Sequence, residues 1–128
     1  VDEETANNAE KPAIAGMYIN RLKAGMPLQA DPTIKFAWHD FALRRIRHGL
    51  LDIKSPYNTY RNIGLPPGPI RVASVEGINA VLNYVHHNFM YICAREDLLC
   101  PHMLARTYSE HLANAARYSK ALNERGIK

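Results

Sequence analysis

The chain has 128 residues, of which 47% are hydrophobic and 22% are charged. This composition fits one globular domain and excludes disordered and collagen-like classes. No apolar run approaches the roughly 20 residues that a membrane helix needs, so we predict no membrane span within this chain. The net charge is +4, but the basic residues are scattered and lack interleaved aromatic rings, so we expect no nucleic-acid partner.

The chain begins with Val1 rather than Met, so we expect a single domain, residues 1–128, cut from a longer protein. The first helix is predicted from Ala9 to Ala24. On one face of it, helical spacing brings together Ile14, Ala15, Tyr18, Ile19 and Leu22. Asn7 or Asn8 is predicted as its N-cap. Gly25 is a natural stop.

Short and ambiguous patterns surround that helix. Residues 1–5 are expected to form the last turn of a preceding helix, and the proline-punctuated residues 26–33 a loop or short strand. Ala42–Ile46 and Leu50–Ile53 indicate a hairpin, with a short helix from Asp40 as the alternative.

The second half begins with a long loop rich in proline and glycine, Ser55–Pro69, and long loops inside compact domains are often functional. Ser74 is predicted to cap a helix, and Phe89–Ala94 to form a buried strand. A capping box, Thr107–Glu110, opens a final helix that ends before Gly126. The predicted class is α+β: a helix-rich single domain with a small β-sheet and a long ordered loop.

Carboxylates are the first candidates for chemistry. Asp2, Glu3 and Glu4 form an acidic triplet, which indicates either a solvated helix end or a general acid. A glutamate against apolar walls has a raised pKa and can hold a proton near neutral pH. Asp31 is the other acid in a suggestive setting, with a turn acceptor as its alternative role.

A polar aromatic run, Tyr57-Asn58-Thr59-Tyr60, offers hydroxyls, an amide and ring faces within four residues. This set suits a glycan, and it equally suits a self-supporting loop with inward-packed tyrosines.

The cysteines Cys93 and Cys100 are read as two ordinary thiols rather than a disulfide. They do not make a zinc site with His102, because such a site needs more ligands at closer spacing. Neither a glycine-rich phosphate loop nor a nucleophile elbow is present in the sequence, and we predict no metal and no cofactor.

Several motifs together resemble one bacterial family. They are Glu4-Thr5, Ile14–Leu22, Gly25–Thr33, Ser55–Tyr60 and Gly64–Ile70. With their Asn-Arg-Leu, Leu-Gln-x-Asp-Pro-Thr and Tyr-Asn-Thr-Tyr blocks in this order, they resemble the MltG/YceG-like family, the endolytic murein transglycosylases of bacteria. The resemblance runs over essentially the whole chain.

The resemblance implies a catalytic glutamate directly before a threonine, which matches Glu4. Glu4 would protonate the glycosidic oxygen between MurNAc and GlcNAc, and the carboxylate would then take the proton of the muramyl 6-hydroxyl. That hydroxyl closes onto C1 and leaves a 1,6-anhydroMurNAc end. Because the nucleophile belongs to the substrate, neither water nor a second catalytic carboxylate is required.

The expected glycan-binding residues follow from the same motifs. They are Gln29, Asp31, Tyr57, Asn58, Thr59, Tyr60 and His102. His102 is the residue kept where the family's Gly-x-His-x-Phe pattern here reads Cys-Pro-His-Met-Leu.

Members of this family usually carry an N-terminal membrane helix and a further extracytoplasmic domain. The resemblance therefore places the whole protein at the periplasmic face of the bacterial inner membrane, attached only through a segment outside this chain. Peptidoglycan glycan strands are the expected partner. The alternative is a non-catalytic glycan-binding module that positions cell-wall synthases, and it would tolerate glutamine at position 4.

Overall fold

The computed structural model describes residues 1–5, 7–39, 48–93 and 103–124. Over these residues the protein is mostly helical, with four α-helices, one 3-10 helix and one two-stranded sheet. In chain order the elements are α1 (Lys11–Ala24), α2 (Asp31–Trp38), the 3-10 helix η1 (His48–Asp52), α3 (Val75–Leu82), β1 (Tyr91–Cys93), β2 (Met103–Ala105) and α4 (Tyr108–Glu124). The predicted helix-rich class with a small sheet is confirmed.

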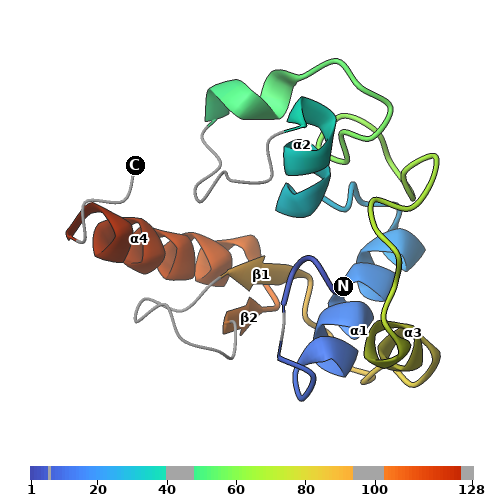
Figure 1. Cartoon of the computed structure of the whole chain (residues 1–128). Helices are drawn as coiled ribbons and strands as arrows, with labels where there is room; N and C mark the ends of the chain where they lie inside the picture. Colours follow the sequence, from blue (N-terminus) through green and yellow to red (C-terminus); the bar gives the residue numbers. More distant parts are fainter. Residues whose placement is uncertain (6, 40–47, 94–102, 125–128) are drawn as a thin grey trace.

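Helix α1 is the centre of the packing. It contacts α3 and β1, while α4 packs against both strands of the sheet (Figure 1). Ile14, Ala15 and Met17 of α1 are each only 1% exposed. From α3 the buried residues are Gly77 and Ala80, and such small side chains allow two helices to approach closely.

The start of α1 differs from the prediction. Glu10 occupies the N-cap, and its side chain makes no capping hydrogen bond to the helix, so the assignment of Asn7 or Asn8 as N-cap is wrong. Asn7 Oδ1 instead accepts from the backbone N–H of Ala9 at 3.0 Å, a turn that precedes the helix. Pro12 lies in the first helical turn, where its missing N–H removes no hydrogen bond.

The prediction of a loop or strand over residues 26–33 is wrong from Asp31 onward, because α2 begins there. Pro32 is again in the first turn, so this proline starts a helix rather than breaking one. The Thr33 hydroxyl donates to the carbonyl oxygen of Ala30 at 2.6 Å and supports the same turn.

Both of these helices end in a left-handed residue. Gly25 closes α1 with φ 70°, as predicted, and its N–H points back to carbonyls of the last turn. His39 closes α2 with φ 56°, a conformation that is uncommon for a residue other than glycine.

The predicted hairpin is wrong over the part that the structure describes. Leu50–Ile53 was assigned as a strand, but His48–Asp52 forms η1. So short an apolar run does not distinguish a strand from a helical turn. Ala42–Ile46 and the alternative helix from Asp40 lie outside the described residues.

The later elements largely follow the sequence pattern. Ser74 caps α3, and its Oγ accepts from the backbone N–H of Gly77 at 2.9 Å. Strand β1 lies inside the predicted Phe89–Ala94 run and pairs antiparallel with β2, an unpredicted strand of three residues. At the start of α4 the Glu110 N–H donates to Thr107 Oγ1 at 3.2 Å, which is one half of the predicted capping box.

Among the described residues, no helix has both the length and the apolar character that a membrane crossing requires.

Candidate active site

The acidic triplet lies in a turn at the start of the chain, in which the Thr5 N–H donates to the Val1 carbonyl oxygen at 3.2 Å. It is not a uniform solvated surface. Each of its three carboxylates contacts a different part of the molecule, and the three environments differ in burial and charge.

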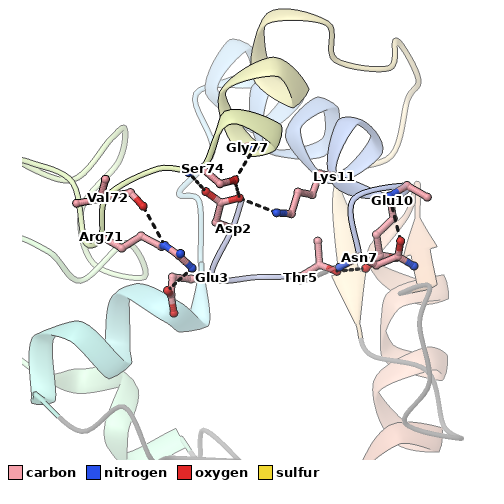
Figure 2. Close-up of polar contacts among 11 residues, drawn as sticks. Asp2, Glu3, Thr5, Asn7, Glu10, Lys11, Arg71, Val72, Ser74 and Gly77 are labelled. Carbon is pink, nitrogen blue, oxygen red and sulfur yellow. Dashed lines mark hydrogen bonds and ion pairs between the residues drawn. The ribbon is translucent and has the colours of Figure 1, made fainter.

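Asp2 is an anchor. Its carboxylate accepts from Lys11 Nζ at 2.8 Å, and from the backbone N–H and the hydroxyl of Ser74 at 2.7 and 2.8 Å (Figure 2). The Asp2 and Lys11 side chains are only 6% and 8% exposed. The hydrogen bond from Lys11, followed by those from Ser74, holds the pKa of Asp2 well below its usual range.

This anchor fixes the first turn to α3. Asp2 lies against the backbone of Gly77, where an added Cβ would overlap its carboxylate. Glu3, next along the chain, forms an exposed ion pair of 2.9 Å with Arg71 (Figure 2). Both contacts tie the turn that carries Glu4 to residues about 70 positions away.

Glu4 is half-buried and contacts α1. Its Oε2 accepts from the hydroxyl of Tyr18 at 2.7 Å. Burial, followed by the charge of Glu4, raises the pKa of Tyr18 well above its ordinary value. The phenol therefore remains protonated at any physiological pH and acts as a hydrogen-bond donor to the carboxylate.

Glu4 and Tyr18 share a groove with a volume of about 340 Å³. Its walls come from the first turn of the chain, from α1 and α3, from residues 28–30 and the first turn of α2, and from the loop at residues 65–73. The lining residues are Val1, Asp2, Glu3, Glu4, Ala15, Tyr18, Ile19, Leu22, Leu28, Ala30, Pro32, Thr33, Leu65, Pro66, Gly68, Pro69, Ile70, Arg71, Ala73 and Val81. Most of them are apolar, so the groove has the character expected around a general acid.

A second carboxylate–phenol pair lies close by. The Tyr60 hydroxyl donates to Asp31 Oδ1 at 2.5 Å. Burial raises the pKa of Asp31 and the hydrogen bond from Tyr60 opposes that rise, while the exposed part of the residue lets solvent screen both effects. The charge of Asp31 also raises the pKa of Tyr18, which places the two pairs in one electrostatic neighbourhood.

Asn58 and Thr59 are buried, at 0% and 1% exposure. The Asn58 amide donates to the carbonyl oxygens of Leu51 and Ile53 at 2.9 and 2.8 Å, and its Oδ1 accepts from the Tyr60 N–H at 2.9 Å. Asn58 thus holds the loop closed and fixes the backbone of Tyr60.

Thr59 joins this loop to the start of α2. Its Oγ1 accepts from the Ala30 N–H at 2.9 Å and lies 2.8 Å from the Thr33 hydroxyl. Of the two interpretations left open for the polar aromatic run, these bonds favour the self-supporting loop at Asn58 and Thr59.

The remaining predicted binding residues lie beside the groove rather than in its wall. Gln29 is exposed, with φ 49°, and its N–H donates to the Thr59 carbonyl oxygen at 3.3 Å. Tyr57 packs on Phe36 with ring centroids 4.7 Å apart. None of the six predicted residues from Gln29 to Tyr60 is among the described groove-lining residues. His102 and Cys100 lie outside the described residues.

Sequence reasoning assigned no role to Tyr18, which it counted with the apolar face of the first helix. It also left Asn20 and Arg21 without roles. The Arg21 guanidinium donates to the carbonyl oxygens of Met90 and Pro27, both at 2.6 Å, and Asn20 Nδ2 donates to that of His87 at 2.8 Å. The Asn-Arg-Leu block therefore clamps two loops onto α1.

His111 of α4 is a further titratable group near these pairs. Its ring stacks on Tyr91 with centroids 5.1 Å apart, and within the described part of the chain its buried Nδ1 has no hydrogen-bond partner. Burial, followed by the charge of Arg21, lowers its pKa, so the ring is neutral at physiological pH. No motif in the sequence pointed to it.

Comparisons with known proteins match this chain to one family. The model of the YceG-like family matches residues 1–117. The endolytic murein transglycosylase of Bacillus subtilis is 35% identical over 125 residues, which cover 98% of this chain and 34% of that protein. The endolytic murein transglycosylase of Streptococcus pneumoniae strain D39 is 34% identical over 98 residues, covering 73% of this chain and 18% of that protein.

Among solved structures, a yceG-like protein from Listeria monocytogenes matches with a TM-score of 0.76 and 33% sequence identity. The match covers 86% of this chain and 34% of the other. The chain thus spans about a third of the length of the Bacillus relative.

Proposed function

The chain belongs to the YceG-like family, and on that basis we propose that it is the catalytic part of a longer peptidoglycan lytic transglycosylase. The observation that carries the proposal is Glu4, a carboxylate held by a protonated phenol on the wall of an apolar groove. An apolar surrounding favours the protonated carboxyl that a general acid needs.

In the proposed reaction Glu4 first acts as an acid. Its proton passes to the oxygen that links C1 of MurNAc to GlcNAc, and the C1–O bond breaks. The muramyl 6-hydroxyl then forms a new bond to C1 while its proton returns to the Glu4 carboxylate. The products are a 1,6-anhydroMurNAc end and a free GlcNAc 4-hydroxyl, and Glu4 is restored without consumption of water.

This scheme needs one catalytic carboxylate, Glu4, because the nucleophile is the hydroxyl of the substrate. Glycosidases that use water or an enzyme nucleophile need two carboxylates across the scissile bond. We propose that Asp31 and Tyr60 contact the glycan beside the groove, together with Gln29 and Tyr57. Asn58 and Thr59 would support them from below, because their side chains are buried.

The reaction would take place on glycan strands at the extracytoplasmic face of the bacterial inner membrane, the location that the family resemblance implies. The rival function, a glycan-binding module that positions cell-wall synthases, shares the groove but needs no acid. The two functions therefore predict different results for substitution of Glu4.

The test is digestion of uncrosslinked glycan strands in H₂¹⁸O, with products read by mass spectrometry. We expect 1,6-anhydro ends without ¹⁸O from the unaltered chain and from Glu3→Gln, and none from Glu4→Gln. Incorporation of ¹⁸O would show a hydrolase and overturn the mechanism. Intact strands that still bind to the unaltered chain would support the non-catalytic rival.

A further inference from the structure

The Glu4–Tyr18 contact is the part of the site that carries a further inference, which rests on the proposed function. Tyr18 lies on the packed helix α1, whereas Glu4 lies in a turn that Asp2 ties to α3. The 2.7 Å hydrogen bond between the Tyr18 hydroxyl and Glu4 Oε2 joins α1 to this turn at the groove wall. The carboxyl group is thereby held from its backbone side and from its tip.

We propose that Tyr18 is a positioning residue: its hydrogen bond to Glu4 Oε2 holds the carboxyl group in the rotamer from which it delivers and recovers the catalytic proton. A phenol O–H donates to a carboxylate oxygen, and the proton on that line belongs to the phenol. One carboxyl rotamer then serves both the acid and the base step.

The surroundings keep Tyr18 in the donor state. Burial and the nearby carboxylates raise its pKa, so the hydroxyl does not ionise over the working pH range. Among the described residues, the charged and titratable groups that act on this pair include Arg21 of α1, Asp31 of α2 and Tyr60. Each of these groups remains in place when the Tyr18 hydroxyl is removed.

The first experiment compares Tyr18→Phe with Tyr84→Phe. The control removes a hydroxyl that accepts from Lys23 at 3.1 Å and lies outside the groove wall. We expect kcat on glycan strands to fall roughly 10- to 100-fold in Tyr18→Phe, with KM within about twofold, because the lost bond is one to a charged group. The pH at which the acid is half-protonated should rise by about one unit, since the lost donor favoured the carboxylate. The control should match the unaltered chain in all three.

A second measurement does not depend on activity or on the folding of Tyr18→Phe. In the unaltered chain labelled at tyrosine ¹³Cζ, one resonance should follow the ionisation of Glu4 as the pH is changed. Glu4→Gln should abolish this pH-dependent shift. Asp31→Asn should abolish only the corresponding shift of the Tyr60 resonance, because Tyr60 donates to Asp31.

The outcomes separate the inference from the proposed function. Cleavage by Tyr18→Phe with unchanged kcat and unchanged pH profile would overturn the positioning role while the transglycosylase remained. If a tyrosine ¹³Cζ resonance follows the ionisation of Glu4 but the chain cleaves no glycan, the catalytic proposal is overturned instead. Absence of that pH-dependent shift in the unaltered chain would overturn the Tyr18 inference directly.

Discussion

Asp2 and Glu4 lie two residues apart in one turn, yet their carboxylates have different surroundings. Asp2 is bound by an ammonium, a backbone N–H and a hydroxyl, and these donors keep it ionised. Glu4 accepts from the uncharged phenol of Tyr18 on the wall of an apolar groove. Donor number and charge therefore separate a structural ion from a group suited to proton transfer.

The difference has a structural origin. Asp2 points toward the N-terminus of α3 and the Lys11 ammonium, where a permanent negative charge is stabilised. Glu4 points toward α1 and the residues that line the groove. Asp2 holds the turn in place, whereas Glu4 carries the proposed chemistry. Substitution of Asp2 should therefore mainly lower stability, and substitution of Glu4 should mainly lower activity.

The largest effect is expected for Glu4→Gln. It removes the exchangeable proton but keeps the shape of the side chain, so we expect glycan cleavage to fall by roughly 10²- to 10⁴-fold. Binding of intact strands and the thermal unfolding midpoint should remain close to those of the unaltered chain. A large loss of stability, measured by circular dichroism, would place Glu4 with Asp2 among the anchors.

The next largest effect is expected for Asp2→Asn, which leaves the buried Lys11 ammonium without its counter-charge. Loss of one partner from a buried pair should cost about 3 kcal/mol in the free energy of unfolding. Urea denaturation measures this directly. The control Lys11→Met removes both the charge and the need for a partner, and combined with Asp2→Asn it should recover part of the loss. A stable Asp2→Asn single variant would show that the turn is held by other contacts.

Asn58→Ala tests whether structural and functional side chains also lie next to each other in the run Tyr57-Asn58-Thr59-Tyr60. Asn58 is fully buried and bonds three backbone groups, so its loss should lower the free energy of unfolding by about 2 kcal/mol. Tyr57→Phe removes a polar atom from the same loop and is expected to leave stability unchanged. Equal stability of Asn58→Ala, together with weaker glycan binding, would assign Asn58 to the binding surface.

The pH dependence of stability should reveal the Asp2 anchor. Its pKa is lowered in the folded chain, so the unfolded chain binds more protons once the pH falls through the ordinary aspartate pKa of about 3.9. The stability that Asp2 contributes is therefore fully present above that range and is lost as the pH drops toward its folded pKa. Urea midpoints from pH 6 to pH 3 should fall less steeply in Asp2→Asn than in the unaltered chain. Parallel curves would contradict the anchor.

The elements that sequence reasoning identified correctly are those with local signals. The long helical repeat of α1, the left-handed Gly25 at its end and the Ser74 cap are each visible within a few residues. One error arose where a single residue type is compatible with two local structures. Pro32 was taken as a sign of a loop, but a proline in the first turn also starts a helix.

The site was predictable only in part, because its geometry depends on contacts between distant residues. The resemblance singled out Glu4, but Asp2 meets Ser74 across 72 positions, and no spacing in the sequence reveals that contact. Tyr18 looked like another apolar face residue of α1. Burial likewise separates Asn58 from Tyr60 within one motif, and burial is a property of the folded chain.

The smallest effect is expected at Glu3, which lies between the two compared residues. Its ion pair with Arg71 is exposed, with 38% and 46% of the two side chains accessible, and such pairs contribute about 0.5 kcal/mol or less. Glu3→Gln should therefore leave the urea midpoint and the rate of glycan cleavage nearly unchanged, at low and at high salt. A rate loss comparable to that of Glu4→Gln would mean that the charge of the whole turn matters rather than one carboxyl group. If Glu3→Gln is neutral while Asp2→Asn loses stability and Glu4→Gln loses glycan cleavage, the local surroundings of each carboxylate determine its role.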